Sequence, residues 1–169
     1  REAHGSVSGY IHSCVKPGDL VDLAAPRGTF FLTERSTPVI LLSAGVGATP
    51  VLSMLHFLAD AGSTRPVWWL HGARDSSEHP FAAESRALLN QLSHSQSHVF
   101  YSRPTPSDRQ TIDYTELGRL SIEAFRGLGL PRDSDAYLCG PVAFMNDLGA
   151  GLVTYGLDPA CVHTELFGA

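Results

Sequence analysis

The pattern of hydrophobic and polar residues changes near residue 34. Beyond it, short apolar runs alternate with segments whose apolar residues recur every three or four positions. The run Val39–Leu42 is continuously apolar, which predicts a strand buried on both faces. The segment 50–58 carries Leu52, Leu55 and Leu58 at helical spacing, and it predicts a helix that follows this strand.

The same alternation continues to the end of the chain. It predicts strands over 66–70, 99–102, 136–139 and 161–166, and helices over 81–92, 121–128 and 141–155. Strands that alternate with helices form parallel sheets covered by helices on both faces. The sequence therefore predicts an α/β fold, a doubly wound, parallel, five-stranded Rossmann-like sheet, over residues 34–169.

Residues 1–33 have a different pattern. An apolar stretch, Tyr10–Val15, predicts a short helix, and the segments 20–24 and 30–32 predict two short strands separated by turns. These elements are too few to bury a core, so we expect residues 1–33 to be the end of a β-rich domain. The chain opens with Arg1 rather than Met, and we expect it to be a processed product or a fragment of a longer protein.

Charge and cysteine usage exclude several classes of protein. Twelve Lys and Arg against 17 Asp and Glu give a net charge of −5, which argues against a nucleic-acid partner. No stretch approaches 18 apolar residues, so no membrane span is predicted. Three widely spaced cysteines predict neither a disulfide framework nor a metal site, and they fit a reducing, cytoplasmic location. His94 and His98 are four residues apart, but Ser95–Ser97 between them has the composition of a helix end, and we predict no metal site there.

The segment Ser43–Pro50, SAGVGATP, follows a predicted buried strand and opens a predicted helix. Gly45 and Gly47 allow a tight turn and a close approach to a phosphate, while the helix start offers free N–H groups. Pro50 stands where the dinucleotide signature has its third glycine. Taken alone, the turn is equally consistent with phosphate binding and with a purely structural role.

Two other strand ends carry arginine. Arg74 and Asp75 follow the second strand, where an acid suits the ribose hydroxyls of NAD and an arginine suits a 2′-phosphate. Ser102 and Arg103 end the third strand, and a hydroxyl beside a guanidinium could also hold a 2′-phosphate. The alternative for each arginine is a solvent-exposed loop position.

Three further segments contain candidate functional residues. Cys139 ends the fourth strand at the sheet edge where ligands bind, although a single buried Cys is usually an inert apolar residue. Glu165 and an aromatic ring end the last strand, where they could face a cofactor or simply close the sheet. Near the start, Ser8 is suited to capping the helix that follows it, and the same geometry can hold a phosphate.

The order of these segments resembles the ferredoxin–NADP reductase superfamily. The series is GSVSGYIH, KPGDLVDLAAPRGTFFL, LLSAGVGATPVLSML, WLHGARD, YLCGPVAFM and HTELFG, and it covers nearly the whole chain. Within the superfamily, the reductase module of flavohaemoglobins and of flavin reductases joined to iron–sulfur domains is the most similar. In that family a flavin-binding β-barrel precedes the nucleotide-binding domain, and residues 1–33 could hold only its C-terminal end.

The resemblance implies roles for individual residues. The flavin phosphates would lie at Gly5, Val7 and Ser8, and the pyrophosphate of the pyridine nucleotide at Gly45, Gly47, Ala48, Thr49 and Pro50. The 2′-phosphate of NADP would lie at Ser102 and Arg103, with Arg74 nearby; the nicotinamide at Cys139, Gly140 and Pro141; and the flavin ring at Glu165 and Phe167. Cys139 and Glu165 would tune geometry and charge at the reacting rings rather than form bonds.

The function implied by the resemblance is that of a flavin-dependent NAD(P)H oxidoreductase. A hydride passes from NADPH or NADH to FAD, and electrons move on to an iron–sulfur, haem or other acceptor, with the protein orienting the two cofactors. The Ser102–Arg103 pair at the third strand favours NADPH without excluding NADH. The alternatives are an isolated NAD(P)-binding module without redox turnover, and a Rossmann-like protein whose glycine turn is structural.

Overall fold

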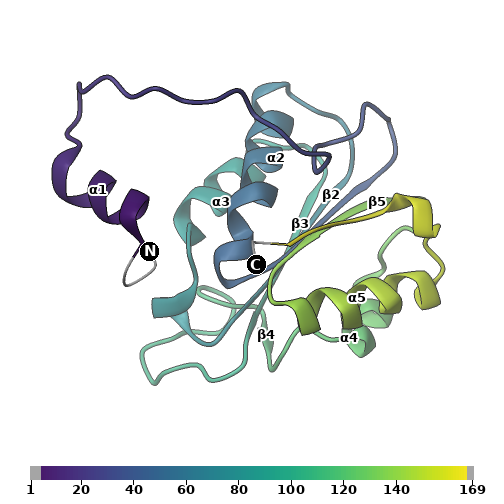
Figure 1. The fold of residues 1–169 in the computed structure, drawn as a ribbon. Coiled ribbons are helices and arrows are strands. Elements are labelled where there is room, and N and C mark those ends of the chain that lie inside the picture. Colours follow the sequence, from purple (N-terminus) through teal and green to yellow (C-terminus); the bar gives the residue numbers. More distant parts are fainter. Residues whose placement is uncertain (1–4, 167–169) are drawn as a thin grey trace.

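A six-stranded parallel sheet forms the centre of the computed structural model, which describes residues 5–166 (Figure 1). Its strands follow the spatial order β4-β3-β2-β1-β5-β6. They are β1 (Val39–Ala44), β2 (Val67–Ala73), β3 (Ser95–Tyr101), β4 (Glu116–Leu117), β5 (Asp135–Cys139) and β6 (Val162–Glu165). The helices are α1 (Ser6–Cys14), α2 (Ala48–Asp60), α3 (Ala82–Leu89), α4 (Ile122–Leu128) and α5 (Val142–Tyr155), with short 3₁₀ turns η1 (Gly45–Gly47), η2 (Ser76–Glu78) and η3 (Pro159–Cys161).

Two apolar cores lie on opposite faces of this sheet. Alternate residues of a strand point to opposite faces, so Val39 and Leu41 of β1 pack with α2 and α3, while Ile40 and Leu42 pack with α4 and α5. All four side chains have no exposed surface. Full burial on both faces explains the continuous apolar run of β1, and it confirms the predicted doubly wound α/β fold.

The predicted number of strands was wrong by one. The sheet has six strands because Glu116 and Leu117 form β4, a two-residue edge strand that pairs with Phe100 and Tyr101 of β3. A strand this short has no periodicity of its own. Its formation depends on the unpaired edge that β3 presents, which sequence patterning does not reveal.

The predicted end of a helix at Ser95–Ser97 was also wrong. These polar residues begin β3, and they pair with Val67, Trp68 and Trp69 of β2. They are only partly buried or exposed because they lie at the solvent-facing end of the strand. Backbone pairing with the buried strand β2 therefore makes these residues a strand in spite of their polar composition.

The N-terminal segment contains α1 but neither of the two strands predicted over 20–24 and 30–32. A strand needs a neighbour for its backbone hydrogen bonds, and none of the described strands lies beside residues 20–24, where Leu20 and Leu23 are exposed. Phe30 and Leu32 instead pack against the α2 side of the core. In Figure 1 the segment after α1 follows an extended path that leads to the sheet.

No helix among residues 5–166 is long and apolar enough to cross a membrane.

Candidate functional site

The order of the strands places a crevice at the ends of β1 and β5. Strands β2, β3 and β4 are added in turn on one side of β1, whereas β5 and β6 are added on the other. The connections after β1 and β5 therefore diverge to opposite faces of the sheet. In open α/β sheets ligands bind at this kind of switch point, outside the carboxyl ends of the strands.

The glycine turn η1 fills one side of this switch point. Gly45 has a φ of 55°, a left-handed backbone conformation that strongly favours glycine. A side chain at Gly47 would collide with the carbonyl group of Cys139 and would lie 2.7 Å from the backbone nitrogen of Gly140. The turn after β1 thus lies directly against the end of β5, and only glycine at position 47 permits this contact.

Helix α2 starts immediately after the turn. Its N-cap, Gly47, provides no side-chain hydrogen bond, so the N–H groups of the first turn have no side-chain cap. Thr49 donates a hydrogen bond from its hydroxyl to the carbonyl of Val46 at 3.0 Å, which stabilises the turn itself. A helix start without a side-chain cap, next to a glycine turn, is suited to binding a phosphate group.

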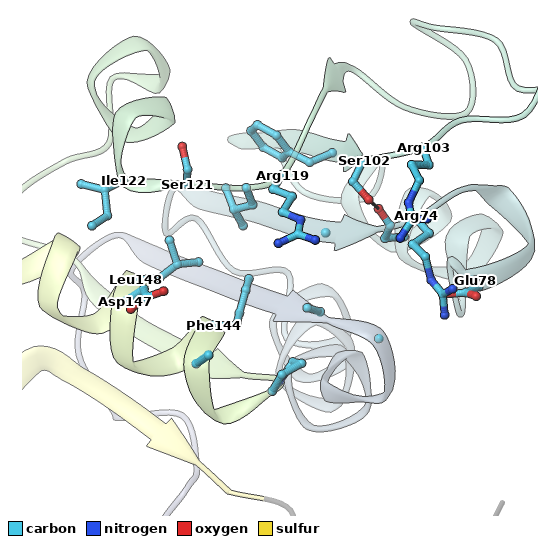
Figure 2. A pocket seen from close by; sticks show the side chains of 18 of the residues that line it. Arg74, Glu78, Ser102, Arg103, Arg119, Ser121, Ile122, Phe144, Asp147 and Leu148 are labelled. Atoms are coloured by element: carbon cyan, nitrogen blue, oxygen red, sulfur yellow. Dashed lines mark hydrogen bonds and ion pairs between the residues drawn. The ribbon is translucent and has the colours of Figure 1, made fainter.

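A cavity of about 780 Å³ adjoins the turn on the face covered by α4 and α5. Its volume lies within the range of about 300–1,000 Å³ typical of small-molecule and cofactor sites. Figure 2 shows the ends of β1, β2 and β3 along one wall and α5 along the other. The polar and charged side chains that line it are Arg74, Glu78, Ser102, Arg103, Arg119, Ser121, Glu123 and Asp147.

Three arginines enter this cavity from different segments. Arg74 donates a hydrogen bond from Nε to Oε2 of Glu78 at 2.7 Å, and its charge is thereby partly neutralised. Arg103 follows β3 and Arg119 precedes α4, and neither forms an ion pair within residues 5–166. These two guanidinium groups are the cavity's available partners for an anionic ligand.

The sequence located part of this site. Of the predicted binding residues, the structure brings Gly45, Arg74, Ser102, Arg103 and Pro141 to the one cavity. Gly47, Cys139 and Gly140 lie together beside it at the switch point. Ala48, Thr49 and Pro50 form the first turn of α2, which begins two residues before the helix start predicted at Pro50.

Cys139 and Glu165 are adjacent at the ends of β5 and β6. The two residues pair in the sheet, and the Cys139 thiol donates a hydrogen bond to the carbonyl of Glu165 at 3.3 Å. Burial, together with the neighbouring Glu165 carboxylate, raises the pKa of the Cys139 thiol to about 11. The thiol is therefore protonated at neutral pH and is not a nucleophile.

The proposed flavin-phosphate residues do not join this cavity. Gly5, Val7 and Ser8 lie at the start of α1, a helix with no buried residue that stands beside the rest of the fold in Figure 1. The predicted capping role of Ser8 was wrong, because the helix already begins at Ser6 and the Ser8 hydroxyl donates to the carbonyl of Gly5. Phe167 lies outside the described residues.

Sequence reasoning missed Glu78, Arg119, Phe144 and Asp147. Glu78 ends the turn η2 and Arg119 lies in the loop before α4, whereas Phe144 and Asp147 are on α5, and all four line the cavity. The one hint in the sequence was the location of Arg119, which precedes a predicted helix near the carboxyl ends of the strands. Phe144 also lies 2.9 Å from where a side chain at Gly140 would stand, so its ring covers that glycine.

Comparison with known proteins agrees with this geometry. The sequence profile of the oxidoreductase NAD-binding domain matches residues 41–149. Among curated proteins, the chain is 38% identical to a flavohemoprotein of Deinococcus radiodurans over 99% of its own length, and 40% identical to one of Chromobacterium violaceum over 98%. It spans only 42% and 41% of those two relatives.

Solved structures show the same relationship. The FAD/NAD-binding domain of nitric oxide dioxygenase from Vibrio cholerae is 40% identical with a TM-score of 0.81, covering 98% of this chain and 65% of that one. A flavohemoglobin from Malassezia yamatoensis, solved with FAD and heme, is 26% identical with a TM-score of 0.79, covering 99% of this chain and 42% of that one. The resemblance to the reductase module of flavohaemoglobins is confirmed.

Proposed function

We propose, from the premise that this chain belongs to the family of oxidoreductase NAD-binding domains, that it binds the pyridine nucleotide in a flavin-dependent NAD(P)H oxidoreductase. The observation that carries the proposal is one arrangement. A glycine turn at the switch point, followed by a helix start without a side-chain cap, opens onto a cavity of about 780 Å³, where Arg103 and Arg119 form no ion pair with any residue of 5–166. Such a cavity suits an elongated, anionic, partly aromatic ligand.

Different groups of residues would bind different parts of the nucleotide. The turn Gly45–Gly47 and the first turn of α2 would hold the pyrophosphate, since a side chain built at Gly45 meets no atom within 4 Å and the space above the turn is open. Ser102 and Arg103 would hold the adenosine end, including the 2′-phosphate of NADP, with Arg119 beside them. Gly140 and Pro141 would border the nicotinamide.

Cys139 and Glu165 act on geometry and charge in this proposal. The neutral Cys139 thiol adds no charge beside the nicotinamide, and its hydrogen bond to β6 holds the ends of β5 and β6 together. A flavin bound next to this edge would accept a hydride from the reduced nicotinamide and pass the electrons on. Glu165 and Phe167 are the residues of this chain proposed to face that flavin.

The domain boundary is part of the same proposal. Residues 1–33 would belong to a flavin-binding domain, and residues 34–169 would be the nucleotide-binding domain. Support comes from the exposed apolar side chains of the described N-terminal segment, including Val7, Tyr10, Leu20 and Leu23. Such a surface, in a chain with a sizeable core elsewhere, is typical of a segment that packs against further protein. Gly5, Val7 and Ser8 would contact the flavin phosphates at the start of α1.

The acceptor we propose is a haem group in a globin domain. The two curated relatives named above are flavohemoproteins, and their names support haem over an iron–sulfur cluster. We also propose a cytoplasmic location, since Cys14, Cys139 and Cys161 are all free thiols, and free thiols persist in reducing compartments.

Two measurements on the purified chain test the proposal. Isothermal titration with NADP⁺ and NAD⁺ measures nucleotide binding directly. Incubation with FAD, desalting and anaerobic addition of NADPH then show whether a retained flavin absorbs in the visible range and bleaches. We expect nucleotide binding that is weakened by Arg103→Ala more for NADP⁺ than for NAD⁺, because only NADP⁺ carries the 2′-phosphate.

The control is Arg126→Ala, which removes an exposed arginine of α4 that does not line the cavity. Flavin that is retained and bleached would extend the proposal to turnover by this chain alone. Nucleotide binding without flavin retention would assign turnover to a longer protein. Failure of the unchanged chain to bind either nucleotide would overturn the proposal.

A further inference from the structure

Four polar side chains form a continuous buried row behind the cavity. The Ser43 hydroxyl is hydrogen-bonded to Nδ1 of His71 at 2.8 Å. The ring of His71 stacks on that of His79, with centroids 4.6 Å apart and planes 15° apart. Nδ1 of His79 is hydrogen-bonded to the Tyr101 hydroxyl at 3.0 Å. We call Ser43, His71, His79 and Tyr101 the histidine row.

The row lies on the α2 and α3 face of the sheet. Ser43 and His71 are partners in the register of β1 and β2. They continue the alternation of Leu41 and Trp69, whose side chains belong to the core on that face. The cavity lies on the opposite face, between the sheet and α4 and α5.

Each member of the row is next to residues that line the cavity. Ser43 precedes Ala44 and Gly45, and His71 precedes Gly72, Ala73 and Arg74. Tyr101 stands between Phe100 and the Ser102–Arg103 pair, and His79 follows Glu78, the ion-pair partner of Arg74. The row therefore joins, from behind, the ends of the three strands that make one wall of the cavity.

The composition of the row differs from that of the core beneath it. One step back along the same face the strands carry Leu41, Trp69 and Val99, and all three are buried. Polar groups cost free energy to bury unless they are hydrogen-bonded, and apolar side chains would fill this space without that cost. Unlike apolar contacts, hydrogen bonds are directional. The polar row therefore constrains the distance and angle between two strand ends.

The row is uncharged at neutral pH. Burial lowers the pKa of His71 to about 3 and that of His79 to about 4, with smaller effects from His79 on His71 and from Arg86 of α3 on His79. Burial raises the pKa of the Tyr101 phenol to about 12. Stacking of Trp69 on His71, and of Tyr114 on Tyr101, encloses the row at both ends. Its bonds are therefore those of neutral groups held in fixed positions.

We propose that the histidine row is a positioning device that sets the span between the Gly45–Gly47 turn and the Ser102–Arg103 pair. This inference rests on the proposed function, in which the turn holds the pyrophosphate and the pair holds the adenosine end of the nucleotide. A dinucleotide must reach both places at once, so its affinity depends on their separation. A fragment that contacts only one place does not depend on it.

The experiment compares a whole nucleotide with a fragment. Tyr101→Phe and His79→Phe each delete the bond between Nδ1 and the hydroxyl while keeping an aromatic ring. Tyr155→Phe is the matched control, because it deletes the hydrogen bond from a partly buried tyrosine hydroxyl to the carbonyl of Leu130, away from the cavity. Isothermal titration of each variant uses NADP⁺ and adenosine 2′-monophosphate, which lacks both phosphates of the pyrophosphate, and thermal unfolding is recorded in parallel.

The expected result separates positioning from stability. Loss of one hydrogen bond corresponds to roughly a fivefold to tenfold rise in Kd, and we expect this for NADP⁺ in both variants, with the Kd for the monophosphate changed less than twofold. The double variant should be no weaker than the single variants, since both delete the same bond. Tyr155→Phe should bind both ligands as the unchanged chain does.

Two results would overturn the inference. One is NADP⁺ binding unchanged in folded Tyr101→Phe and His79→Phe. The other is an equal loss of affinity for NADP⁺ and the monophosphate together with a lower Tm, which indicates general loosening rather than a changed span. If the unchanged chain binds neither ligand, the proposed function fails and the inference fails with it, so the two failures are distinguishable.

Discussion

Gly47 supports the candidate binding site because it has no side chain. The usual reason for glycine in a phosphate-binding turn is close approach of the ligand to the backbone. Here a Cβ at position 47 would meet the protein's own backbone, at Cys139 and Gly140. The requirement for glycine at this position therefore comes from packing of β1 against β5, whereas at Gly45 it comes from a positive φ.

Gly47→Ala should lower the free energy of unfolding by roughly 2–4 kcal/mol, because backbone at the switch point must move to admit the methyl group. Nucleotide affinity should fall as well, since the same movement displaces the turn. Urea unfolding measures the first effect and titration the second. Gly127→Ala in α4 is the control: a Cβ there meets no atom within 4 Å, so stability should rise by up to about 1 kcal/mol. Equal stability of the two variants would contradict this account.

At the scale of elements, the start of β5 is tied to the segment that leads into β1. Asp135 is fully buried and accepts hydrogen bonds from Thr37 and from Nη2 of Arg65, the latter at 3.2 Å. Arg65 also donates to the carbonyls of Thr33 and Thr37 at 3.1 and 2.7 Å. The Asp135–Arg65 ion pair and these hydrogen bonds therefore hold residues 33–37 against the amino-terminal ends of the strands, at the end of the sheet away from the candidate site.

Asp135→Asn should cost about 3–5 kcal/mol of stability, because it leaves the largely buried Arg65 guanidinium without its counter-charge. Chemical denaturation at pH 7 measures the effect. Arg35→Gln tests the same cluster more gently, because the Arg35 side chain is half exposed and lies 3.5 Å from Asp135, and its loss should lower the free energy of unfolding much less than Asp135→Asn does. Asp133→Asn, an exposed change two residues away, should be neutral. A neutral Asp135→Asn would show that the ion pair contributes nothing.

For the molecule as a whole, the histidine row couples stability to pH. His71 and His79 have folded-state pKa values of about 3 and 4, below the ordinary value of 6.5, because both are buried. The unfolded chain therefore binds protons that the folded chain does not, between pH 6.5 and those values. The contribution of these two histidines to the free energy of unfolding is therefore fully present above pH 6.5 and is lost as the pH falls below that value.

The free energy of unfolding should decrease by about 2 kcal/mol for each of the two histidines between pH 7 and pH 5. Urea midpoints at pH 7, 6 and 5 measure this slope. His79→Phe removes one of the two groups and should make the slope about half as steep. A slope that is the same in His79→Phe and the unchanged chain would contradict the assignment.

Local patterns were sufficient for the main elements of the fold. A continuous apolar run predicted β1, and apolar spacing predicted α2 and α5, because burial on one or both faces dictates which positions are apolar. The glycine turn was also visible, since its conformation restricts residue type locally. These local features are enough to place the candidate site at the carboxyl ends of the strands.

The tertiary structure decided which of those strand ends meet and what lies behind them. Strand β4, the cavity residue Arg119 and the pairing of His71 with Ser43 all depend on contacts between segments far apart in the sequence. No local pattern records such contacts, because each residue type involved is common in loops and strands alike. Likewise the segment 20–24 alternates as a strand does, yet without a neighbouring strand its backbone does not form one. Sequence alone therefore determined the elements and the type of site, and spatial pairing determined its walls, its charges and its support.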